Sequence, residues 1–425
     1  MMKILHFNTY EKTGGAPIAA SRLHRSLLSR GVESLYLYSI KHFGHVSSDN
    51  LHKVSPGRLY EKIRLAAGHL LADLPTVKQR LTGSLDLKYY YTPGWFPGLN
   101  VHRQLKKYRP DIIHLHWISM GFIRIESLSE VRIPIVWTLH DSWAFTGGCH
   151  IPYDCKRYTD RCGKCPALSS SNPNDISAKT LSRKFNSWKD LNITLVAPSN
   201  WLAKCARKSR LFSGNRIETI PHGIDTDCFK PIGKKVARRI LNFPDNKKLL
   251  LFGAVAATID INKGFGFLKQ AMRVLRHHFK KDDIELVIFG AEKPVNQPDL
   301  YFNTHYLGFL HDDISLKVAY SAADVMVVPS IQEAFGLTAV EAMACGTPVV
   351  AFNTSGLADI VNSKINGYLA DPFDATDLAD GIMWVIEDAD RLQTLAANAR
   401  QKTEQSFSSA HNTEKYAALY DDLLH

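Results

Sequence analysis

The sequence predicts an α/β protein made of two doubly wound, Rossmann-like domains that face a cleft. Its 425 residues are more than a single hydrophobic core usually holds. Short apolar runs alternate with helix-length segments, which is the pattern of a parallel sheet covered by helices. This alternation restarts after residues 220–231, where Pro221, Gly223 and Pro231 indicate a linker. Ligands of such domains bind outside the carboxyl ends of the strands, so each strand end is a candidate for the site.

The first domain, predicted over residues 1–220, opens with a strand, a glycine turn and a helix. The strand is KILHFN at 3–8, the turn is TGGAP with Gly14 and Gly15, and the helix covers 18–31 with apolar residues at helical spacing. Further apolar runs predict strands at 34–40, 111–117, 133–140 and 193–199. The strand and helix signals alternate, which predicts βαβ units.

The second domain is predicted over residues 232–388. Its apolar runs predict six strands, at 248–255, 284–291, 304–309, 324–330, 347–352 and 367–370. Residues 389–425 have helical character and no strand of their own, so this C-terminal segment can pack on either domain.

Composition and the N-terminus point to a cytoplasmic protein with reduced thiols. Hydrophobic residues make up 45% of the chain and charged residues 22%, which is ordinary for a globular protein. The apolar run near the N-terminus is broken by His6 and Asn8 and is not a signal peptide. Later windows contain no run of the roughly 20 apolar residues that a membrane span requires.

The positive charge lies in the first half of the chain. Residues 1–200 contain 27 Lys and Arg against 14 Asp and Glu, a balance of +13, whereas residues 201–425 contain 25 against 27, a balance of −2. A basic half of this kind is suited to bind nucleic acid, an anionic membrane surface or an anionic substrate. We find no nucleic-acid reader motif. Residues 58–74 form a candidate amphipathic basic helix, which favours the membrane surface; the alternative is a solvated helix face packed on its own domain.

The most informative stretch is DVMVVPSIQEAFGLTAVEAMACGTPVVAF, residues 324–352. A buried strand is followed by a loop with Glu333 and by a helix that Gly346 can cap. The helix start offers free N–H groups and a positive dipole end to a phosphate. The residues at that start are Phe335, Gly336, Leu337 and Thr338.

Glu333 and Glu341 are suited to bracket a nucleotide diphosphate sugar. They are eight residues apart, which is about 12 Å for a fully helical interval and less with a bent loop. Ionised carboxylates accept hydrogen bonds from sugar and ribose hydroxyls. The alternative is that Glu341 is a solvated helix residue, but its neighbours Ala339, Val340, Ala342 and Met343 are apolar.

These residues resemble the signature of the retaining glycosyltransferases of family 4, which have the GT-B fold. Within it, Glu333 is followed after seven residues by Glu341, in the context PS, EAFGL, EAMACGTPVVA and a following Gly356. The resemblance extends over most of the chain. It includes GG at 14–15, HD at 140–141, PSNWL at 198–202, IPHGIDTDCF at 220–229, KG at 263–264, LVIFGA and AYSAADVMVVPS.

The resemblance implies a donor site on the C-terminal domain. In that family the Glu matching Glu333, with the backbone of the positions matching 335–337, holds the donor sugar and diphosphate. The Glu matching Glu341 holds the ribose, and the Lys matching Lys263 neutralises the leaving diphosphate. Family members commonly have an Arg directly after the glycine of the first C-terminal strand, where this chain has Ala254. Lys263 then works with a base from elsewhere, or the helix start holds more of the diphosphate.

The resemblance places the acceptor mainly on the N-terminal domain. The glycines matching Gly14 and Gly15 let the backbone approach phosphate or acceptor, and the His matching His140 lies at the sugar; the alternative for His140 is a strand-end histidine bonded to backbone. The leaving phosphate can accept the acceptor's proton, so no general base is assigned, and no metal is expected in catalysis. The Asp-x-Asp patterns at 225–227 and 388–390 lie in a linker and a late helix and are read as coincidence.

Four cysteines lie within residues 146–166, at Cys149, Cys155, Cys162 and Cys165. The last two have the Cys-x-x-Cys spacing of zinc ligands, with a glycine for the tight turn. The readings are a structural zinc ion that holds a long loop, packed unmetallated thiols, or redox catalysis. A family 4 subset associated with colanic-acid and exopolysaccharide synthesis is similar in having HD, an aromatic run, GGC and later cysteines here.

The main functional hypothesis is a retaining hexosyltransferase. It moves a sugar from a UDP- or GDP-sugar to a lipid-linked saccharide in surface polysaccharide (exopolysaccharide, capsule or O-antigen) synthesis, at the inner face of the cytoplasmic membrane, with no nucleic-acid partner. One alternative is a zinc-clipped basic protein that binds nucleic acid through residues 1–200. Another is a different GT-B enzyme, an epimerase or a phosphorylase.

Overall fold

The computed structural model describes residues 2–40, 51–53, 59–81, 85–86, 88–95, 98–296 and 298–425. The chain forms two compact units. The N-terminal unit comprises Met1–Pro221 together with Thr413–His425, and the C-terminal unit comprises His222–Asn412. Within the described ranges, no helix is both long and apolar enough to cross a membrane.

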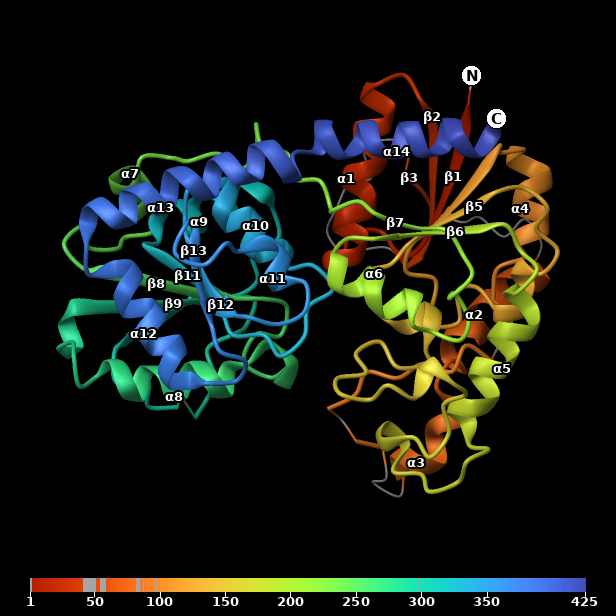
Figure 1. Ribbon diagram of the computed structural model, residues 1–425, viewed down its shortest axis with the longest axis horizontal. Helices are drawn as coiled ribbons and strands as arrows, with labels where there is room; N and C mark the ends of the chain where they lie inside the picture. The colour runs from red at the N-terminus through yellow and green to blue at the C-terminus, as the bar shows by residue number, and fades with distance from the viewer. Residues whose placement is uncertain are drawn as a thin grey trace. The chain divides into compact units, whose positions relative to one another are not determined.

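The N-terminal unit is built on a parallel sheet that has seven strands within the described residues (Figure 1). In the order of the sheet these are β3 (Leu51–Lys53), β2 (Glu33–Ile40), β1 (Lys3–Tyr10), β4 (Ile112–Leu115), β5 (Ile135–Thr138), β6 (Ile193–Ala197) and β7 (Ile217–Thr219). All strands predicted for this domain are present. The sequence analysis missed β3 and β7, whose three residues each are too short to show a period.

The helices of this unit lie between its strands in the sequence, except the C-terminal helix, which follows them all. They are α1 (Gly15–Ser29), α2 (Leu59–Leu70), α3 (Val77–Leu81), α4 (Val101–Tyr108), α5 (Ile176–Trp188), α6 (Asn200–Arg207) and the C-terminal α14 (Ser409–Leu424). The amphipathic helix predicted over 58–74 corresponds to α2 and the turn after it, and Arg58 lies outside the described residues.

The C-terminal unit has a second parallel sheet, with six strands in the described part. Their order is β10 (Asn303–Tyr306), β9 (Ile284–Phe289), β8 (Lys248–Gly253), β11 (Val325–Val328), β12 (Val349–Phe352) and β13 (Gly367–Ala370). Its helices are α7 (Lys234–Ile240), α8 (Phe265–Leu275), α9 (Asp313–Ala322), α10 (Leu337–Ala344), α11 (Leu357–Ile360), α12 (Ala375–Ile386) and α13 (Ala389–Lys402). The strands are apolar on both faces because a separate core cluster covers each face, for example around Leu251 on one side and Leu250 on the other.

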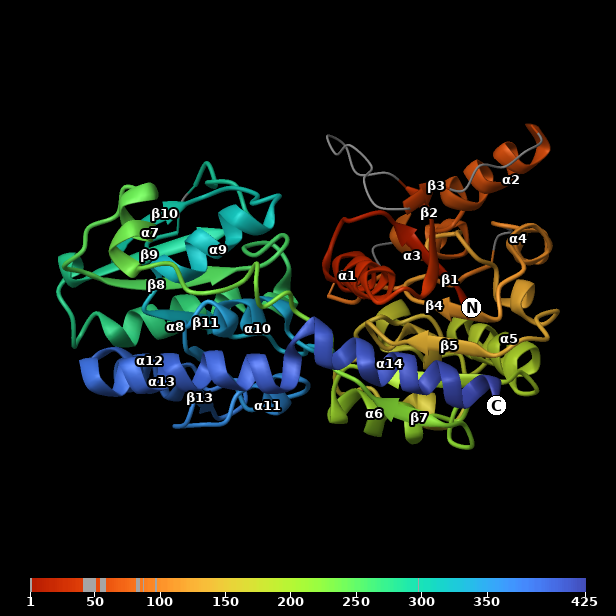
Figure 2. The same ribbon diagram turned by 90° about the horizontal axis from the view of Figure 1, so that it is seen from above.

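The C-terminal segment 389–425, which the sequence analysis treats as a single helical region, is divided between the two units. α13 contributes Leu395 and Ala399 to the cores of the C-terminal unit. α14 lies beside the strands of the N-terminal unit (Figure 2) and buries Tyr416, Leu419 and Tyr420 in its core. The buried tyrosine hydroxyls explain this placement, because each finds a polar partner on the sheet.

Candidate functional site

The loop that carries Glu333 is held by contacts from two other segments of the C-terminal unit. Asn262, which is 2% exposed, donates from Nδ2 to the carbonyl oxygen of Gln332 at 2.8 Å and accepts the backbone N–H of the same residue at 3.1 Å. The backbone N–H of Glu333 donates to Ser355 Oγ at 2.9 Å. These bonds join the loop before α10 to the turn at 261–263 and to the segment after β12. The backbone that carries the carboxylate of Glu333 is therefore held in place.

Lys263 and Glu333 form an ion pair. Nζ of Lys263 donates to Oε1 of Glu333 at 2.7 Å, and the side chains are 23% and 18% exposed. Burial lowers the pKa of Lys263, but the charge and hydrogen bond of Glu333 outweigh this effect and hold it above its ordinary value. The ammonium is therefore charged at neutral pH and lies beside the start of α10.

Two glycines allow this close approach of loops. Gly264 has φ of +75°, and a Cβ there would lie 1.8 Å from the carbonyl oxygen of Pro329 at the end of β11. Gly336, the N-cap of α10, has φ of +116°, and a Cβ would lie 2.9 Å from Leu357. Side chains at these positions would move Lys263 away from β11 or displace the helix start.

The first turn of α10 has the properties predicted for an anion site. No side chain caps its N-terminus, so the N–H groups around Leu337 and Thr338 point out of the helix end. Phe335 is 3% exposed and stacks edge-on with His222 and Phe407. Its ring is thus part of the core, and only its backbone is at the helix start.

Glu341 is buried in the second turn of α10. It is 4% exposed, and its Oε2 accepts a hydrogen bond from the Tyr320 hydroxyl at 2.9 Å. The alternative of a solvated helix residue is therefore wrong. Tyr320, from α9, is a positioning residue that the sequence analysis missed, because its apolar neighbours predict only a core aromatic ring.

Ala254 supplies no charge to this region, since it packs against the apolar core of the C-terminal unit. The two Asp-x-Asp patterns have local roles in the backbone. Asp225 accepts N–H bonds from the two residues that follow Thr226, and Asp388 caps α13 by accepting the N–H of Arg391.

In the N-terminal unit, His140 follows β5 and belongs to a row of imidazoles. His140 Nε2 lies 3.1 Å from Nδ1 of His116, and Nε2 of His116 lies 3.0 Å from Nδ1 of His6. Burial, with the nearby charges of His114 and His24, lowers the pKa of His6 well below its ordinary value. His6, at the inner end of the row, is therefore neutral at physiological pH.

Within the described residues, one group of three metal-ligand side chains has atoms within 4.8 Å of one another: His6, His114 and His116. Both ring nitrogens of His114 are hydrogen-bonded to hydroxyls, those of Tyr420 at 2.6 Å and Thr138 at 2.7 Å. This group is therefore a hydrogen-bonded part of the core rather than a metal site.

Asp141 is fixed from three directions. Its Oδ2 accepts from Trp117 Nε1 at 2.7 Å and lies 2.6 Å from His150 Nδ1, and its Oδ1 accepts the N–H of Trp143. Although burial works in the opposite direction, His150 and these hydrogen bonds lower the pKa of Asp141. A cavity of about 10 Å³, the scale of one water molecule, is lined by His140, Asp141 and His150 among others.

His150 is a buried residue beside Asp141 to which the sequence analysis assigned no role on this side. It is 2% exposed, and its second nitrogen, Nε2, lies 2.8 Å from the Thr92 hydroxyl. The only signal in the sequence is its place next to Cys149. His150 therefore links the cysteine-rich loop to the end of β5.

Gly14 and Gly15 lie at the start of α1. Gly14 has φ of +92° and is the N-cap of that helix, which no side chain caps. The turn between β1 and α1 thus presents backbone N–H groups, as a phosphate or acceptor site requires.

The four cysteines of the loop line one cavity, and all are reduced. The thiols of Cys149 and Cys165 are hydrogen-bonded to each other, whereas within the described residues no third thiol lies within 4.8 Å of both. Burial raises the pKa of Cys155, and that of Cys162 to about 12. The hydrogen bond from Cys149 lowers the pKa of Cys165, so the four thiols differ in their tendency to ionise.

Comparison with known families decides between the functional hypotheses. The sequence profile described as "Glycosyltransferase Family 4" matches residues 13–228, and the profile "Glycosyl transferases group 1" matches residues 233–402. The chain belongs to glycosyltransferase family 4. The glycosyltransferase hypothesis and the α/β fold of GT-B type are thereby confirmed.

Three similar proteins illustrate the relationship of this glycosyltransferase to others. D-inositol 3-phosphate glycosyltransferase of Mycolicibacterium smegmatis is 32% identical over 363 residues, which cover 82% of this chain and 72% of that protein. Sucrose-phosphate synthase of Thermosynechococcus elongatus has the same fold, with a TM-score of 0.72 at 20% identity over 100% and 99% of the two chains. The Anabaena protein HepE, solved in complex with UDP-glucose, superposes with a TM-score of 0.64 at 18% identity over 99% and 100%.

Proposed function

We propose that this glycosyltransferase transfers a hexose, with retention of configuration, from a UDP- or GDP-sugar to a lipid-linked saccharide in bacterial surface polysaccharide synthesis. One observation carries the proposal: a charged Lys263–Glu333 pair lies directly before an uncapped helix start, and Glu341 is buried and oriented in the same helix. The UDP-glucose complex of the structurally similar Anabaena protein supports a nucleotide-sugar donor.

In this proposal, each group of the C-terminal unit binds one part of the donor. Lys263 and the N–H groups of 335–338 hold the diphosphate, which replaces Glu333 as the partner of the ammonium. Glu333, released from the lysine, accepts hydrogen bonds from sugar hydroxyls. Glu341, oriented by Tyr320, accepts hydrogen bonds from the ribose hydroxyls. Ala254 leaves Lys263 and the helix start to hold the diphosphate without the usual Arg.

The reaction breaks the bond between the anomeric carbon and the diphosphate. Lys263 and the helix N–H groups stabilise the charge that develops on the leaving diphosphate. Hydrogen-bond donors that are already oriented toward this charge contribute most to catalysis. The acceptor hydroxyl attacks from the same face and its proton passes to the leaving phosphate, so the new bond has the configuration of the old one. His140 and the turn at Gly14–Gly15 bind sugar and acceptor from the N-terminal unit.

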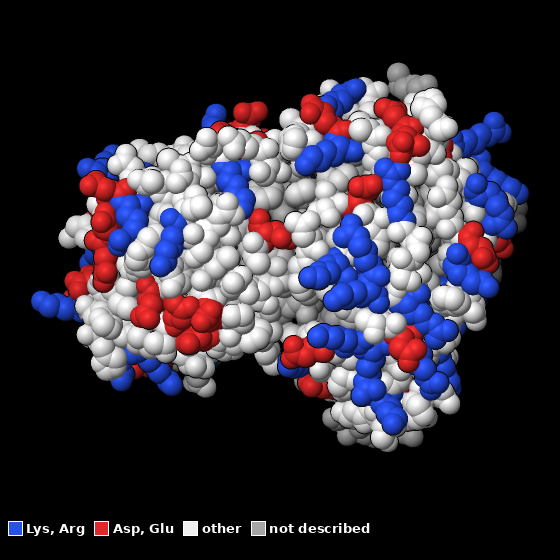
Figure 3. Space-filling model, viewed as in Figure 1, with Lys and Arg blue, Asp and Glu red and all other residues white. Residues whose placement is uncertain are grey.

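A membrane-bound acceptor agrees with two surfaces of the N-terminal unit. Figure 3 shows Lys and Arg side chains gathered over α6, where Lys204, Arg207 and Lys208 are exposed. The segment from α2 to α3 exposes large apolar side chains, with Leu70 and Leu81 each 83% exposed. Basic and apolar groups of this kind bind anionic lipid surfaces, which supports the proposed contact with the inner face of the cytoplasmic membrane.

Turnover of labelled UDP- and GDP-sugars with membrane extract as acceptor tests the proposal. The expected result is one preferred donor, a lipid-extractable product, and loss of transfer in Glu333→Ala. Absence of transfer or hydrolysis with every donor, together with full complementation in cells by Glu333→Ala, would overturn the function. Vesicles with and without anionic lipid test the membrane contact separately.

A further inference from the structure

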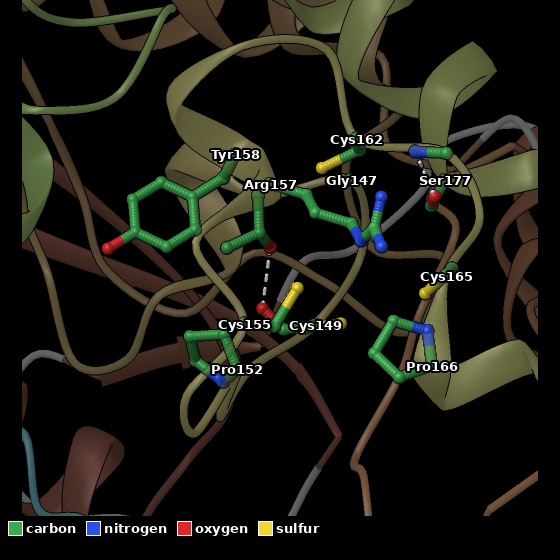
Figure 4. A pocket seen from close by; sticks show the side chains of 12 residues that line it. Gly147, Cys149, Pro152, Cys155, Arg157, Tyr158, Cys162, Cys165, Pro166 and Ser177 are labelled. Carbon is green, nitrogen blue, oxygen red and sulfur yellow. Dashed lines mark hydrogen bonds between the residues drawn. The ribbon is translucent and has the colours of Figure 1, made fainter. Parts of the chain in front are cut away.

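The cysteine cluster surrounds a small, partly open cavity in the N-terminal unit. The cavity has a volume of about 20 Å³, which is the scale of one water molecule or one ion. Figure 4 shows Cys162 above the cavity, Cys149 and Cys155 below it, and Cys165 to the right. No carboxylate is among the residues that line it. Apart from hydroxyl groups and the side chain of Arg157, the polar side chains of the lining are the four cysteine thiols.

Backbone N–H groups already point at three of the four sulfur atoms. Arg157 donates to Cys155, and Gly147 donates to Cys162. Cys165 accepts from the backbone two and three residues further along the chain. Such bonds stabilise the thiolate over the thiol, and they are the outer contacts that orient ligands of a metal ion.

A buried lysine lies next to the cluster. Lys184 is 0% exposed, and its Nζ donates to the carbonyl oxygens of Trp143 and Thr146, the second of which lines the cavity. Burial lowers the pKa of Lys184 well below its ordinary value, whereas the negative charges of Asp141, Cys162 and Cys149 act in the opposite direction. A centre with four thiolates around a divalent ion carries a net negative charge, which would favour the ammonium form of this side chain.

The loop itself has little regular structure to hold it. Residues 146–175 contain only the short turns Arg157–Thr159 and Pro166–Leu168. Cys162 and Lys164 both have positive φ, at 57° and 45°, on either side of Gly163. Long irregular loops in compact domains are uncommon unless something fixes them, and backbone in this conformation persists only when its surroundings enforce it.

We propose that the loop binds one structural zinc ion through the thiolates of Cys149, Cys155, Cys162 and Cys165. Each thiol gives its proton to solvent as its Zn–S bond forms, and no oxidation state changes. Four sulfurs around zinc, at bonds of about 2.3 Å, lie about 3.8 Å apart. Cys149 and Cys165 are already in contact, and the side chains of Cys155 and Cys162 turn inward to complete the site.

Metal analysis of the full-length, untagged protein tests this assignment. We expect about one zinc per chain and, after exchange, the intense thiolate-to-cobalt absorption of a tetrahedral cobalt site. Titration with an organomercurial should release the zinc as four thiols react. This titration uses the wild-type chain, so it stays informative even where variants fail to fold.

Cys155→Ser and Cys162→Ser should each lower the zinc content below about half of the wild-type value, whereas the matched Cys205→Ser, outside the loop, should keep it. Four freely reactive thiols in a zinc-free, fully stable protein would overturn the proposal. A mass deficit from disulfides among the four cysteines would overturn it too. These results leave the glycosyltransferase assignment untouched, because the donor residues lie in the other unit.

Discussion

Replacing Glu333 by Gln should separate sugar binding from diphosphate binding. In the structure, Oε1 of Glu333 lies 2.7 Å from Nζ of Lys263 and forms an ion pair with it. Both side chains are less than a quarter exposed. An ion pair of this kind contributes about 1 kcal/mol, which a bound diphosphate must replace. In Glu333→Gln the ammonium has no such competitor, so UDP should bind about fivefold more tightly. Sugar transfer should fall about 100-fold or more, because the amide no longer offers an ionised acceptor to the sugar hydroxyls.

Calorimetric titration of UDP into the wild type, Glu333→Gln, Lys263→Met and the double variant measures both effects. Lys263→Met should weaken UDP binding about tenfold or more, and the double variant should resemble it, because no ammonium remains to be released. Glu285→Gln, which breaks the Lys247–Glu285 pair of the same unit, is the matched control and should leave UDP binding unchanged. A loss of UDP affinity in Glu333→Gln as large as in Lys263→Met would refute the division of roles.

Three further perturbations test other contacts. Tyr320→Phe removes the hydrogen bond to Glu341 and should raise the KM for the donor about fivefold with little change in kcat, which steady-state kinetics would show. Gly264→Ala should lower the free energy of unfolding by about 1–3 kcal/mol, because its Cβ would meet the carbonyl oxygen of Pro329; an unchanged denaturation midpoint would contradict this. Burial lowers the pKa of His114 to about 3. The unfolded chain therefore takes up a proton first, and urea unfolding at several pH values should show stability falling from about pH 6.5 to pH 3 by up to about 1.4 kcal/mol per unit.

The strands of the C-terminal unit and its candidate site residues could be predicted from the sequence, because both appear as local sequence patterns. A run such as VMVV at β11 is long enough to identify a buried strand, and Glu333 and Glu341 share one loop and helix. The residues that contact them could not be predicted. Asn262 and Gln332 are 70 residues apart in the chain, and nothing in either segment alone encodes that they meet. Contacts of this kind are set when β8 and β11 pair in the sheet.

The placement of α14 shows a second limit of the sequence. Its apolar spacing predicts a helix with a buried face but gives no information on which sheet that face covers. The deciding groups are polar. The Tyr420 hydroxyl reaches His114, and the Tyr416 hydroxyl reaches Thr138, both inside the N-terminal unit. Since a buried hydroxyl without a partner is costly, these two bonds select the site.

The cysteine-rich loop contacts the end of β5 through His150. All polar contacts that fix Asp141 are hydrogen bonds accepted by its two oxygens, from Trp117, Trp143 and His150. A carboxylate held in this way, with a lowered pKa, is a poor proton acceptor and serves to position the end of β5 beside His140. His150 follows directly after Cys149, and Asp141 follows directly after His140. The 2.6 Å hydrogen bond between His150 and Asp141 therefore joins the cysteine-rich loop to the segment that carries His140.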